Sequence, residues 1–380
     1  REEGRGAVGP EAPERNMSDR NQTTCTNPAT GDVIGSSPLH DLDDLKKAIE
    51  RSRKAQKIWA RTPVDERAKA LFRIRDYIVE RADELADVIS KDNGKTRADA
   101  MIAEVVPAAA AADYYARNAK RFLRTRRLMP GILLLANKYS KVVRVPFGVV
   151  GIISPWNYPY SIPFSEVVMA LVAGNGVLLK TATQTQMIGR ALERTILAGG
   201  LPDGLFSFVN LPGRLAGDAF LECGVDKLFF TGSVPVGKKL MAKAAETLTP
   251  VSLELGGNDA MLVCQDADVD RAAAGAVWAG MQNAGQSCGG VERIYVHEDV
   301  YEPFMAKLKA KVEALRVGPD EDWNVDIGAI TTNGQADTIR QHIDEAVEKG
   351  ATIFAQAKAP ENSKGIFIPP TVLTDVDHTM

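Results

Sequence analysis

Apolar residues recur every third or fourth position through the first third of the chain. The pattern runs from "DLDDLKKAIERSRKAQKIWA" (residues 41–60) to "MIAEVVPAAAAADYYARNAKRFL" (residues 101–123), with charged residues between the apolar ones. This spacing predicts amphipathic helices, because it places the apolar side chains on one face. Asp41 or Asp43 can cap the first helix by accepting a hydrogen bond from a free backbone N–H.

From Val149 onward, apolar runs of strand length alternate with helical segments. The expected strands are "VVGIIS", "GVLLK", "FSFVNL", "KLFFTG" and "VSLELGG", and the helices between them are "FSEVVMALVAGN", "TQMIGRALERTILAGG" and "VPVGKKLMAKAAETL". Near-continuous apolar runs are typical of parallel strands that are buried on both faces. The alternation therefore predicts a doubly wound parallel sheet.

A second alternation follows, with "AMLVC", "RIYVH" and "TIFAQ" as strands and "DVDRAAAGAVWAGMQNAG", "VYEPFMAKLKAKVEAL" and "ADTIRQHIDEAVEKG" as helices. The predicted fold class is α/β, with two doubly wound parallel-sheet domains joined near residues 254–257. Between the N-terminal helices and the first of these strands, "ILLLANKYSKVVRVPFGVV" predicts a hairpin, or a pair of extended segments, on either side of Asn137 and Lys138.

The composition is that of an ordinary soluble globular protein, with 380 residues, 45% hydrophobic, 25% charged and a formal net charge of -3. A charge so near zero argues against nucleic acid or an anionic membrane as a partner. No apolar stretch approaches the ~18 residues needed to cross a bilayer. The opening "REEGRGAVGPEAPER" lacks apolar periodicity and holds four acidic residues, so residues 1–20 are interpreted as a disordered tail and not as a targeting signal.

The cysteines and histidines give no sign of a metal site. Cys25, Cys223, Cys264 and Cys288 have neither zinc-type nor CxxC spacing, and the four histidines are scattered. Four thiols without paired spacing in a large chain favour a reducing, cytoplasmic location.

Cys288 differs from a packing cysteine in its neighbours. It lies in "NAGQSCGG" (residues 283–290), between a serine and two glycines. A cysteine that packs in a core usually sits among bulky apolar residues. Glycines instead let the backbone approach a ligand and leave N–H groups free to point at it. This setting favours a nucleophile.

Two strand ends carry residues suited to phosphate. "FFTGSVPVG" (residues 229–237) places Gly232 and Ser233 between a strand and a helix, where free N–H groups attract phosphate. The spacing is not the GxGxxG of an ordinary dinucleotide loop, so a simple tight turn is the competing interpretation. Lys180 ends the strand "GVLLK", where a phosphate or ribose contact competes with an ordinary solvated charge.

Two further polar side chains stand next to apolar segments. Asn157, in "SPWNYPYSIP" (residues 154–163), has an amide that can donate to a developing oxyanion, with an ordinary turn residue as the alternative. Glu254, in "LELGGND" (residues 253–259), lies between two leucines in an apparently buried strand. Burial would raise its pKa and suit it to general-base catalysis, with a buried structural ion pair as the alternative.

Taken together, "PWNYP", "FTGSVPVG", "ELGG" and "GQSCGG", in that order, resemble the aldehyde dehydrogenase superfamily. The "ELGG" glutamate precedes the "GQSC" cysteine by 34 positions (288 − 254), which is among the family's most distinctive signatures. The resemblance runs from about Asp41 to the last residues. It implies an NAD(P)-dependent enzyme of the hydrolytic type, which oxidises a small-molecule aldehyde to the acid through a cysteine thiohemiacetal and thioester.

Carried over residue by residue, the resemblance makes Cys288 the nucleophile, Glu254 the base and Asn157 an oxyanion donor together with the Cys288 N–H. It implies NAD or NADP as cofactor and no metal. The cofactor contacts that it implies come from Ile153, Ser154, Pro155, Trp156, Lys180, Thr181, Thr183, Gly213, Phe230, Thr231, Gly232, Ser233, Val236, Leu255 and Gly256.

The resemblance also implies a domain organisation. Residues 21–130 and 147–254 would form the NAD(P)-binding domain, residues 131–146 an oligomerisation hairpin and residues 255–380 the catalytic domain. A homodimer or homotetramer is expected of the full-length protein.

Two features depart from the family pattern. Thr183 stands where many NAD-preferring members carry a glutamate that binds the ribose 2′-hydroxyl, so tolerance of NADP is expected. The chain ends at Met380, before the family's glutamate–phenylalanine–glycine–proline motif. A fragment or a truncated homologue is therefore expected, and Arg1 in place of a starting methionine favours the fragment.

Two other functions stay open at this point. A coenzyme A-acylating member needs no water-activating base, so Glu254 argues against it; a non-catalytic homologue with a binding role is the other. The aldehyde is undefined, because Tyr158, Tyr160, Trp278 and Met281 can line a substrate tunnel or belong to the core. No arginine pair stands ready for a second carboxylate, which favours an apolar or aromatic aldehyde.

Overall fold

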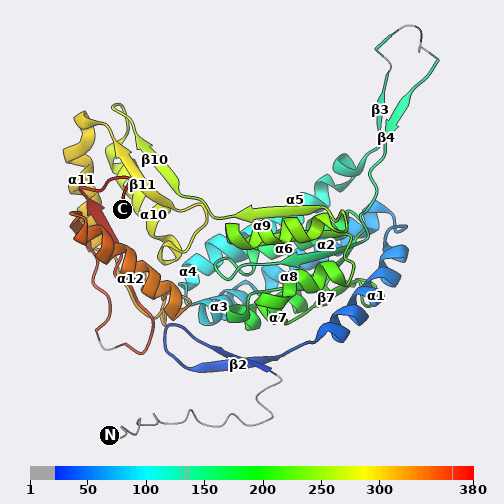
Figure 1. Cartoon of the computed structure of the whole chain (residues 1–380), viewed down its shortest axis with the longest axis horizontal. Helices are drawn as coiled ribbons and strands as arrows, with labels where there is room; N and C mark the ends of the chain where they lie inside the picture. The colour runs from blue at the N-terminus through cyan, green and yellow to red at the C-terminus, as the bar shows by residue number, and fades with distance from the viewer. Residues whose placement is uncertain (1–21, 130, 133, 135–136, 362) are drawn as a thin grey trace, which may run out of the picture.

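The protein is described by a computed structural model covering residues 22–129, 131–132, 134, 137–361 and 363–380. Figure 1 shows a larger lobe built around a central sheet, a smaller lobe around β10 and β11, and a hairpin, β3 and β4, that projects from the larger lobe. The tail predicted for residues 1–20 lies outside the described residues.

The predicted run of N-terminal helices is confirmed. It comprises α1 (Leu42–Trp59), α2 (Val64–Glu80), α3 (Ala82–Asn93), α4 (Arg97–Ala100), a π-helical turn (Met101–Val105) and α5 (Val106–Leu123). Of the two candidate caps for α1, Asp41 is the one used: its carboxylate accepts from the Asp44 N–H at 2.8 Å. Asp44 returns the contact by accepting from the Asp41 N–H, which completes a capping box.

The first predicted sheet is also confirmed. Its strands are β5 (Val149–Ile153), β6 (Gly176–Lys180), β7 (Phe206–Phe208), β8 (Lys227–Gly232) and β9 (Val251–Leu255), all parallel and in the order β7-β6-β5-β8-β9. The connecting helices are α6 (Ser161–Val172), α7 (Gln186–Leu197), α8 (Gly213–Glu222) and α9 (Val234–Ala245), of which α8 was not predicted. The strand order reverses between β5 and β8, which is where ligands bind in sheets of this kind.

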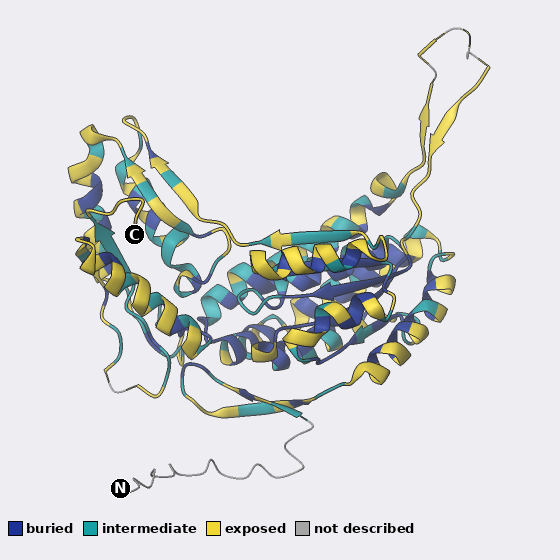
Figure 2. Cartoon of the chain, in the orientation of Figure 1, coloured by how far each residue is buried: buried dark blue, intermediate teal, exposed yellow. Residues whose placement is uncertain are grey.

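Helices cover both faces of the middle of this sheet, so β5 and β6 are dark throughout in Figure 2, whereas the edge strand β9 is only partly buried. Successive side chains of a strand point to opposite faces. Val150 and Ile152 of β5 accordingly join one hydrophobic cluster, whereas Val149 and Ile153 join the other. Burial on both faces explains why these segments are apolar at nearly every position.

The smaller lobe differs from the second parallel sheet that the sequence predicts. Its elements are β10 (Asp259–Val263), α10 (Val269–Met281), a 3-10 turn (Gln282–Gly285), β11 (Val291–Val296), α11 (Glu298–Glu313), α12 (Asn333–Glu348), β12 (Thr352–Gln356) and β13 (Thr371–Thr374). β10 and β11 are parallel, as expected, but β12 pairs with β13 in an antiparallel ladder. Parallel strands need a long crossover such as α10, whereas a loop alone joins β12 to β13.

The predicted hairpin is present but begins earlier than predicted. β3 (Arg126–Leu128) pairs with β4 (Ser140–Val142), so the paired segment starts before residue 131. A second ladder, β1 (Gln22–Thr26) with β2 (Val33–Pro38), was not predicted and packs near α7. Across the described ranges, no helix combines the length and the apolar character required to traverse a bilayer.

Candidate active site

The carboxyl ends of the parallel strands meet at one edge of the central sheet. β5, β6, β8 and β9 end there at Ile153, Lys180, Gly232 and Leu255. The remaining residues expected to bind a cofactor lie within two residues of these ends, in the turns that follow or at the starts of α8 and α9: Ser154, Pro155, Trp156, Thr181, Thr183, Gly213, Phe230, Thr231, Ser233, Val236 and Gly256. One edge of the sheet therefore gathers motifs that are far apart in the sequence.

Lys180 is buried at the end of β6, with only 5% of its surface exposed. Burial lowers the pKa of its ammonium group to about 8. A Cβ added to Gly213 would lie 3.6 Å from the lysine Nζ, so the ammonium group sits next to the first residue of α8. A helix begins with a partial positive charge, so two positive groups face the same space. This arrangement favours an anionic ligand.

The start of α9 offers a second place for an anion. Ser233 is the N-cap of α9, yet its side chain makes no capping hydrogen bond and is exposed. The amide groups of the first helical turn are therefore left without that cap. Two buried hydroxyls nearby, Ser154 Oγ and Thr231 Oγ1, have no hydrogen-bond partner among the described residues. Buried polar groups are normally satisfied, so these two are available to a ligand.

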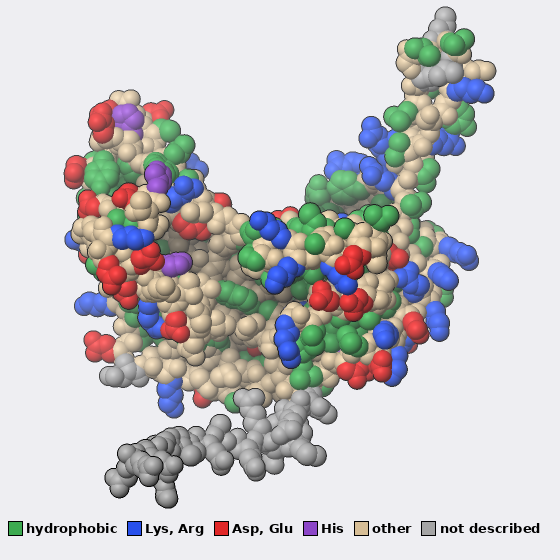
Figure 3. Space-filling view, viewed as in Figure 1, with side chains coloured by type: hydrophobic (Ala, Val, Ile, Leu, Met, Phe, Trp, Pro, Cys, Tyr) green, Lys and Arg blue, Asp and Glu red, His purple; other side chains and the backbone are tan. Residues whose placement is uncertain are grey.

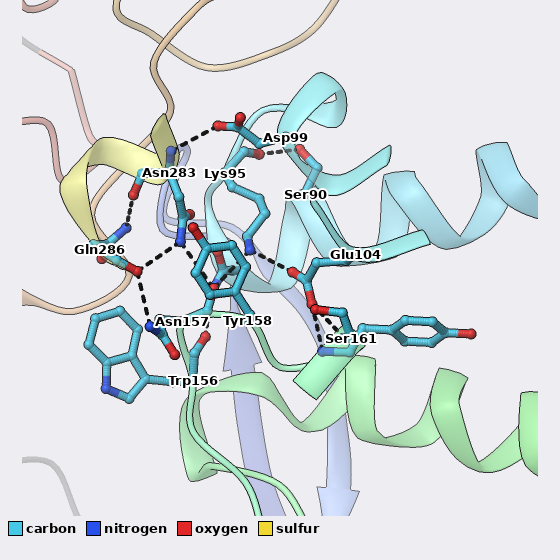
Figure 4. Close-up of polar contacts among 12 residues, drawn as sticks. Ser90, Lys95, Asp99, Glu104, Trp156, Asn157, Tyr158, Ser161, Asn283 and Gln286 are labelled. Carbon is cyan, nitrogen blue, oxygen red and sulfur yellow. Dashed lines mark hydrogen bonds and ion pairs between the residues drawn. The ribbon is translucent and has the colours of Figure 1, made fainter. Parts of the chain in front are cut away.

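The loop that carries Asn157 is held from behind by α3 and the residues after it. The carbonyl of Trp156 accepts from Asn93 Nδ2 at 2.7 Å, and the carbonyl of Asn157 accepts from Lys95 Nζ at 2.8 Å. Figure 4 shows Lys95 on one side of the loop and the Asn157 amide turned toward Gln286 on the other. The backbone of the loop is thus fixed while the amide is directed at the segment containing Asn283 and Gln286.

The segment before Cys288 has an unusual backbone. Asn283, Ala284 and Gly285 have φ angles of 55°, 55° and 75°, so three consecutive residues are left-handed. An alanine in this region is strained by roughly 1–2 kcal/mol. The side chain of Gln286 holds the turn: its Nε2 donates to the Asn283 carbonyl and its Oε1 accepts from the Thr331 N–H, both at 3.0 Å.

Cys288 itself is exposed, in contrast to the buried residues that hold its loop. Asn283 is 1% exposed and Gln286 is 7% exposed. The loop thus anchors itself with two amide side chains and presents its thiol to solvent. A packing role for Cys288 does not fit this exposure.

Three of the motifs come together at the loop that carries Cys288. Asn157 Nδ2 donates to the Gln286 carbonyl at 3.1 Å, and Asn283 Nδ2 donates to the Asn157 carbonyl at 3.1 Å. A Cβ added to Gly257 would lie 3.5 Å from the Cys288 carbonyl oxygen, so the "ELGG" segment also borders the cysteine loop. The tertiary structure therefore brings residues 157, 257 and 288 to one place.

The environment of Glu254 differs from the one predicted. Glu254 is exposed, not buried. β9 is an edge strand on which side chains alternate, so Leu253 and Leu255 pack toward the cluster under α9 while Glu254 points to the other side. The buried carboxyl near it is Glu166 of α6, whose pKa is raised to about 8 by burial and by the charge of Glu254.

Sequence patterns did not point to several residues that build this site. Lys95, Glu104 and Glu166 look like ordinary surface charges in the sequence, yet each is at most 7% exposed. For Glu104 and Glu166 the only sequence signal is a charge at a position where the helical period expects an apolar residue, and that signal is weak alone. Lys95 lies between α3 and α4, where no such period applies. Tyr160, a tunnel candidate, belongs to the core: it is fully buried and bonds to Thr195 at 2.9 Å.

The chain is similar to known proteins over most of its length. The sequence profile of the aldehyde dehydrogenase family matches residues 16–380. A relative from Mycobacterium ulcerans (strain Agy99), whose name describes a succinate-semialdehyde dehydrogenase of the NADP(+) type, is 39% identical over 354 residues, 92% of this chain and 67% of the relative. The chain therefore spans about two thirds of the length of such relatives.

Solved structures agree with the family profile. A succinate-semialdehyde dehydrogenase from Burkholderia pseudomallei superposes with a TM-score of 0.89 at 34% identity, over 96% of this chain and 74% of that one. An NAD+ complex of an aldehyde dehydrogenase from Bacillus cereus gives a TM-score of 0.87 at 30% identity, over 94% and 72%.

Proposed function

The chain belongs to the aldehyde dehydrogenase family, and from that membership we propose that it oxidises an aldehyde to the carboxylic acid with NAD+ or NADP+ through Cys288. The observation that carries the proposal is the hydrogen bond from Asn157 Nδ2 to the Gln286 carbonyl. It holds an amide donor next to the loop of an exposed cysteine, as nucleophilic catalysis at a carbonyl requires.

The strand ends fit a dinucleotide. The Lys180 ammonium next to Gly213 and the uncapped start of α9 suit its phosphates, and the unpartnered hydroxyls of Ser154 and Thr231 suit its polar groups. When bound, NAD+ or NADP+ supplies the acceptor for the hydride that leaves the substrate. Thr183 is exposed at the start of a 3-10 turn, three residues after Lys180, and brings no carboxylate that would repel a 2′-phosphate. We therefore expect NADP+ to be accepted at least as well as NAD+.

The chain's own residues account for the remaining chemistry. The Cys288 thiolate attacks the aldehyde carbon, and the oxygen of the resulting thiohemiacetal receives hydrogen bonds from the Asn157 amide and the Cys288 N–H. Once oxidised, the substrate is held on Cys288 as a thioester. Glu254 takes a proton from the water that hydrolyses this thioester, and exposure of Glu254 gives that water access. The thiol is then regenerated and the acid leaves.

The names of the relatives make succinic semialdehyde the first aldehyde to test, because the curated and the solved relatives reported above both include enzymes named for it. An apolar or aromatic aldehyde such as benzaldehyde is the contrasting probe that the sequence itself favours. A ratio of kcat/KM values for the two probes assigns the substrate class.

The β3–β4 hairpin has a surface suited to assembly. β3 and β4 project into solvent with exposed apolar side chains, such as Leu128 and Val142, next to basic ones (Figures 1 and 3). We propose that this hairpin joins copies of the chain into a homodimer or homotetramer, which light scattering of wild type and Leu128→Asp would measure. Cysteine usage supports a cytoplasmic location.

The test of the activity is reduction of NADP+ and NAD+ with each probe aldehyde, by this chain and by the full-length protein. Cys288→Ala should abolish reduction and leave cofactor binding intact, because the exposed thiol supports no packing. Cys264→Ala is the matched control, since Cys264 is also exposed and free. Turnover by Cys288→Ala at the wild-type rate would exclude the proposed nucleophile. Product formation only with coenzyme A would support the acylating alternative.

A further inference from the structure

A fully buried ion pair lies behind the Asn157 loop. Lys95 Nζ and Glu104 Oε1 are 2.5 Å apart, and neither side chain has any exposed surface. Gly94, with φ of 93°, ends α3 and redirects the chain just before Lys95. Glu104 comes from the π-helical turn, an irregularity that is frequent at functional sites.

The lysine of this pair is bound to the loop as well as to the glutamate. Its Nζ donates to the carbonyl of Asn157 at 2.8 Å and lies 4.4 Å from the centroid of the Tyr158 ring. The ammonium group thus contacts the backbone of the residue whose side chain is the proposed oxyanion donor.

The glutamate holds the other end of the same loop. Glu104 Oε2 accepts from the backbone N–H groups of Tyr160 and Ser161, at 2.7 and 3.1 Å. Lys95 and Glu104 therefore fix the chain on both sides of Pro159, as the dashed lines in Figure 4 trace.

Neighbouring residues tie the cysteine loop to the same support. Asp99 Oδ2 accepts from the Asn283 N–H at 3.1 Å, and Asn93 Nδ2 donates to the Trp156 carbonyl at 2.7 Å. Residues 93–104 therefore hold both the loop with the amide donor and the loop with the thiol.

We propose that Lys95 and Glu104 are positioning residues for catalysis, which fix the Asn157 backbone so that its amide stays directed at the Cys288 loop. A buried ion pair is a poor source of stability, because apolar residues of similar volume stabilise a fold as well or better. The directional hydrogen bonds that the pair makes to one loop are what apolar side chains would not supply. Neither charge contacts Asn157 Nδ2 or Cys288, so both act through Asn157. The proposal rests on the oxyanion role proposed above.

The first test is a set of kinetic measurements on Glu104→Gln and Lys95→Met with succinic semialdehyde and NADP+. Each variant should lower kcat by about tenfold or more, since small misplacements of a catalytic group are costly. The KM for NADP+ should stay within about twofold. Lys95 and Glu104 contact this loop at residues 157–161, and none of these residues is proposed to hold the cofactor phosphates. A purely structural role would lower the amount of folded enzyme and leave kcat per folded active site unchanged.

A double-mutant cycle with Asn157→Ala separates positioning from other effects. If the pair acts through Asn157, Glu104→Gln should lower kcat strongly in the wild-type background and by less than about twofold in the Asn157→Ala background. Equal losses in both backgrounds would overturn the proposal.

Folding is controlled in two ways. The double variant Lys95→Met with Glu104→Gln leaves no unpaired buried charge, and it should fold while still losing kcat. Asp320→Asn is the matched control. Asp320 pairs with Arg97, which lies within residues 93–104, but Asp320 does not contact the Asn157 loop. Wild-type kcat in the double variant would contradict the proposal.

Hydrogen exchange of residues 156–161 distinguishes this proposal from the proposed function. Exchange of the Tyr160 and Ser161 amides should accelerate in Glu104→Gln and stay unchanged in Asp320→Asn. Unchanged exchange together with unchanged kcat would overturn the positioning role and leave the activity intact. Faster exchange in a chain that reduces no NADP+ with any aldehyde would show that Glu104 holds the loop and would contradict the proposed function.

Discussion

Glu166 of α6 and Glu254 of β9 approach closely enough for the charge of Glu254 to act on Glu166. Burial first, and Glu254 second, raise the pKa of Glu166 to about 8. Glu166 is 7% exposed, and its Oε2 has no hydrogen-bond partner among the described residues. A carboxyl that stays protonated at neutral pH therefore lies near the proposed base.

This relationship predicts a pH-dependent cost to stability. The folded state holds the Glu166 proton more tightly than the unfolded chain, where the pKa is near its ordinary value of 4.5. Stability from this group therefore falls as pH rises from about 4.5 to about 8 and changes little above that. Glu166→Gln should stabilise the protein on the order of a few kcal/mol at pH 8 and have little effect at pH 4.5.

Urea unfolding of wild type and Glu166→Gln across that pH range measures the difference. A constant difference between pH 4.5 and 8 would show that Glu166 does not titrate as described. Glu254→Gln is the companion variant. This variant should lower the pKa of Glu166, because the charge of Glu254 helps to raise it. The loss of stability between pH 4.5 and 8 should therefore be smaller than in wild type.

Asn157→Ala tests the oxyanion donor. It removes one amide donor and should lower kcat on the order of a hundredfold. Cofactor affinity should be retained. Asn118→Ala is the matched control, because Asn118 is a half-buried asparagine whose amide donates to the Tyr114 carbonyl within α5. A loss of less than threefold in Asn157→Ala would return Asn157 to the role of a turn residue.

Glu254→Gln tests the base. Thioester hydrolysis should slow more than hydride transfer, because only hydrolysis needs a proton acceptor for water. Stopped-flow measurement should therefore show a burst of reduced cofactor followed by a slow phase. Glu50→Gln, an exposed glutamate on α1, serves as control. If burst and steady rates fall in parallel, Glu254 has another role.

Thr183→Glu tests cofactor choice. The new carboxylate would accept from the 2′-hydroxyl of NAD+ and repel the 2′-phosphate of NADP+, so preference should move toward NAD+ by roughly 1–3 kcal/mol. The measurement is the ratio of kcat/KM for the two cofactors in the full-length protein. Gln184→Glu adds the same charge at the next exposed position and should shift the ratio less. Strict NAD+ dependence that neither substitution alters would contradict the prediction.

The central sheet was predictable from sequence because its signals are local. Apolar runs such as Val149–Ile153 follow from burial on both faces, and the helices between them follow from the helical period. The same local signals missed α8 and β13, and they placed β12 in a parallel sheet, whereas it pairs antiparallel with β13. Strand direction depends on how the connecting chain runs in space, which periodicity does not encode.

The sequence by itself determined which chemical groups are present, because Asn157, Glu254 and Cys288 stand in motifs whose order and spacing can be read along the chain. Only the tertiary structure decided their surroundings. Glu254 is exposed because β9 is an edge strand, and Glu166 is the carboxyl that became buried. Lys95 and Glu104 meet behind residue 157 because α3 and the π-helical turn fold against a loop more than fifty positions away, and burial of charge is a property of that packing and of no local pattern.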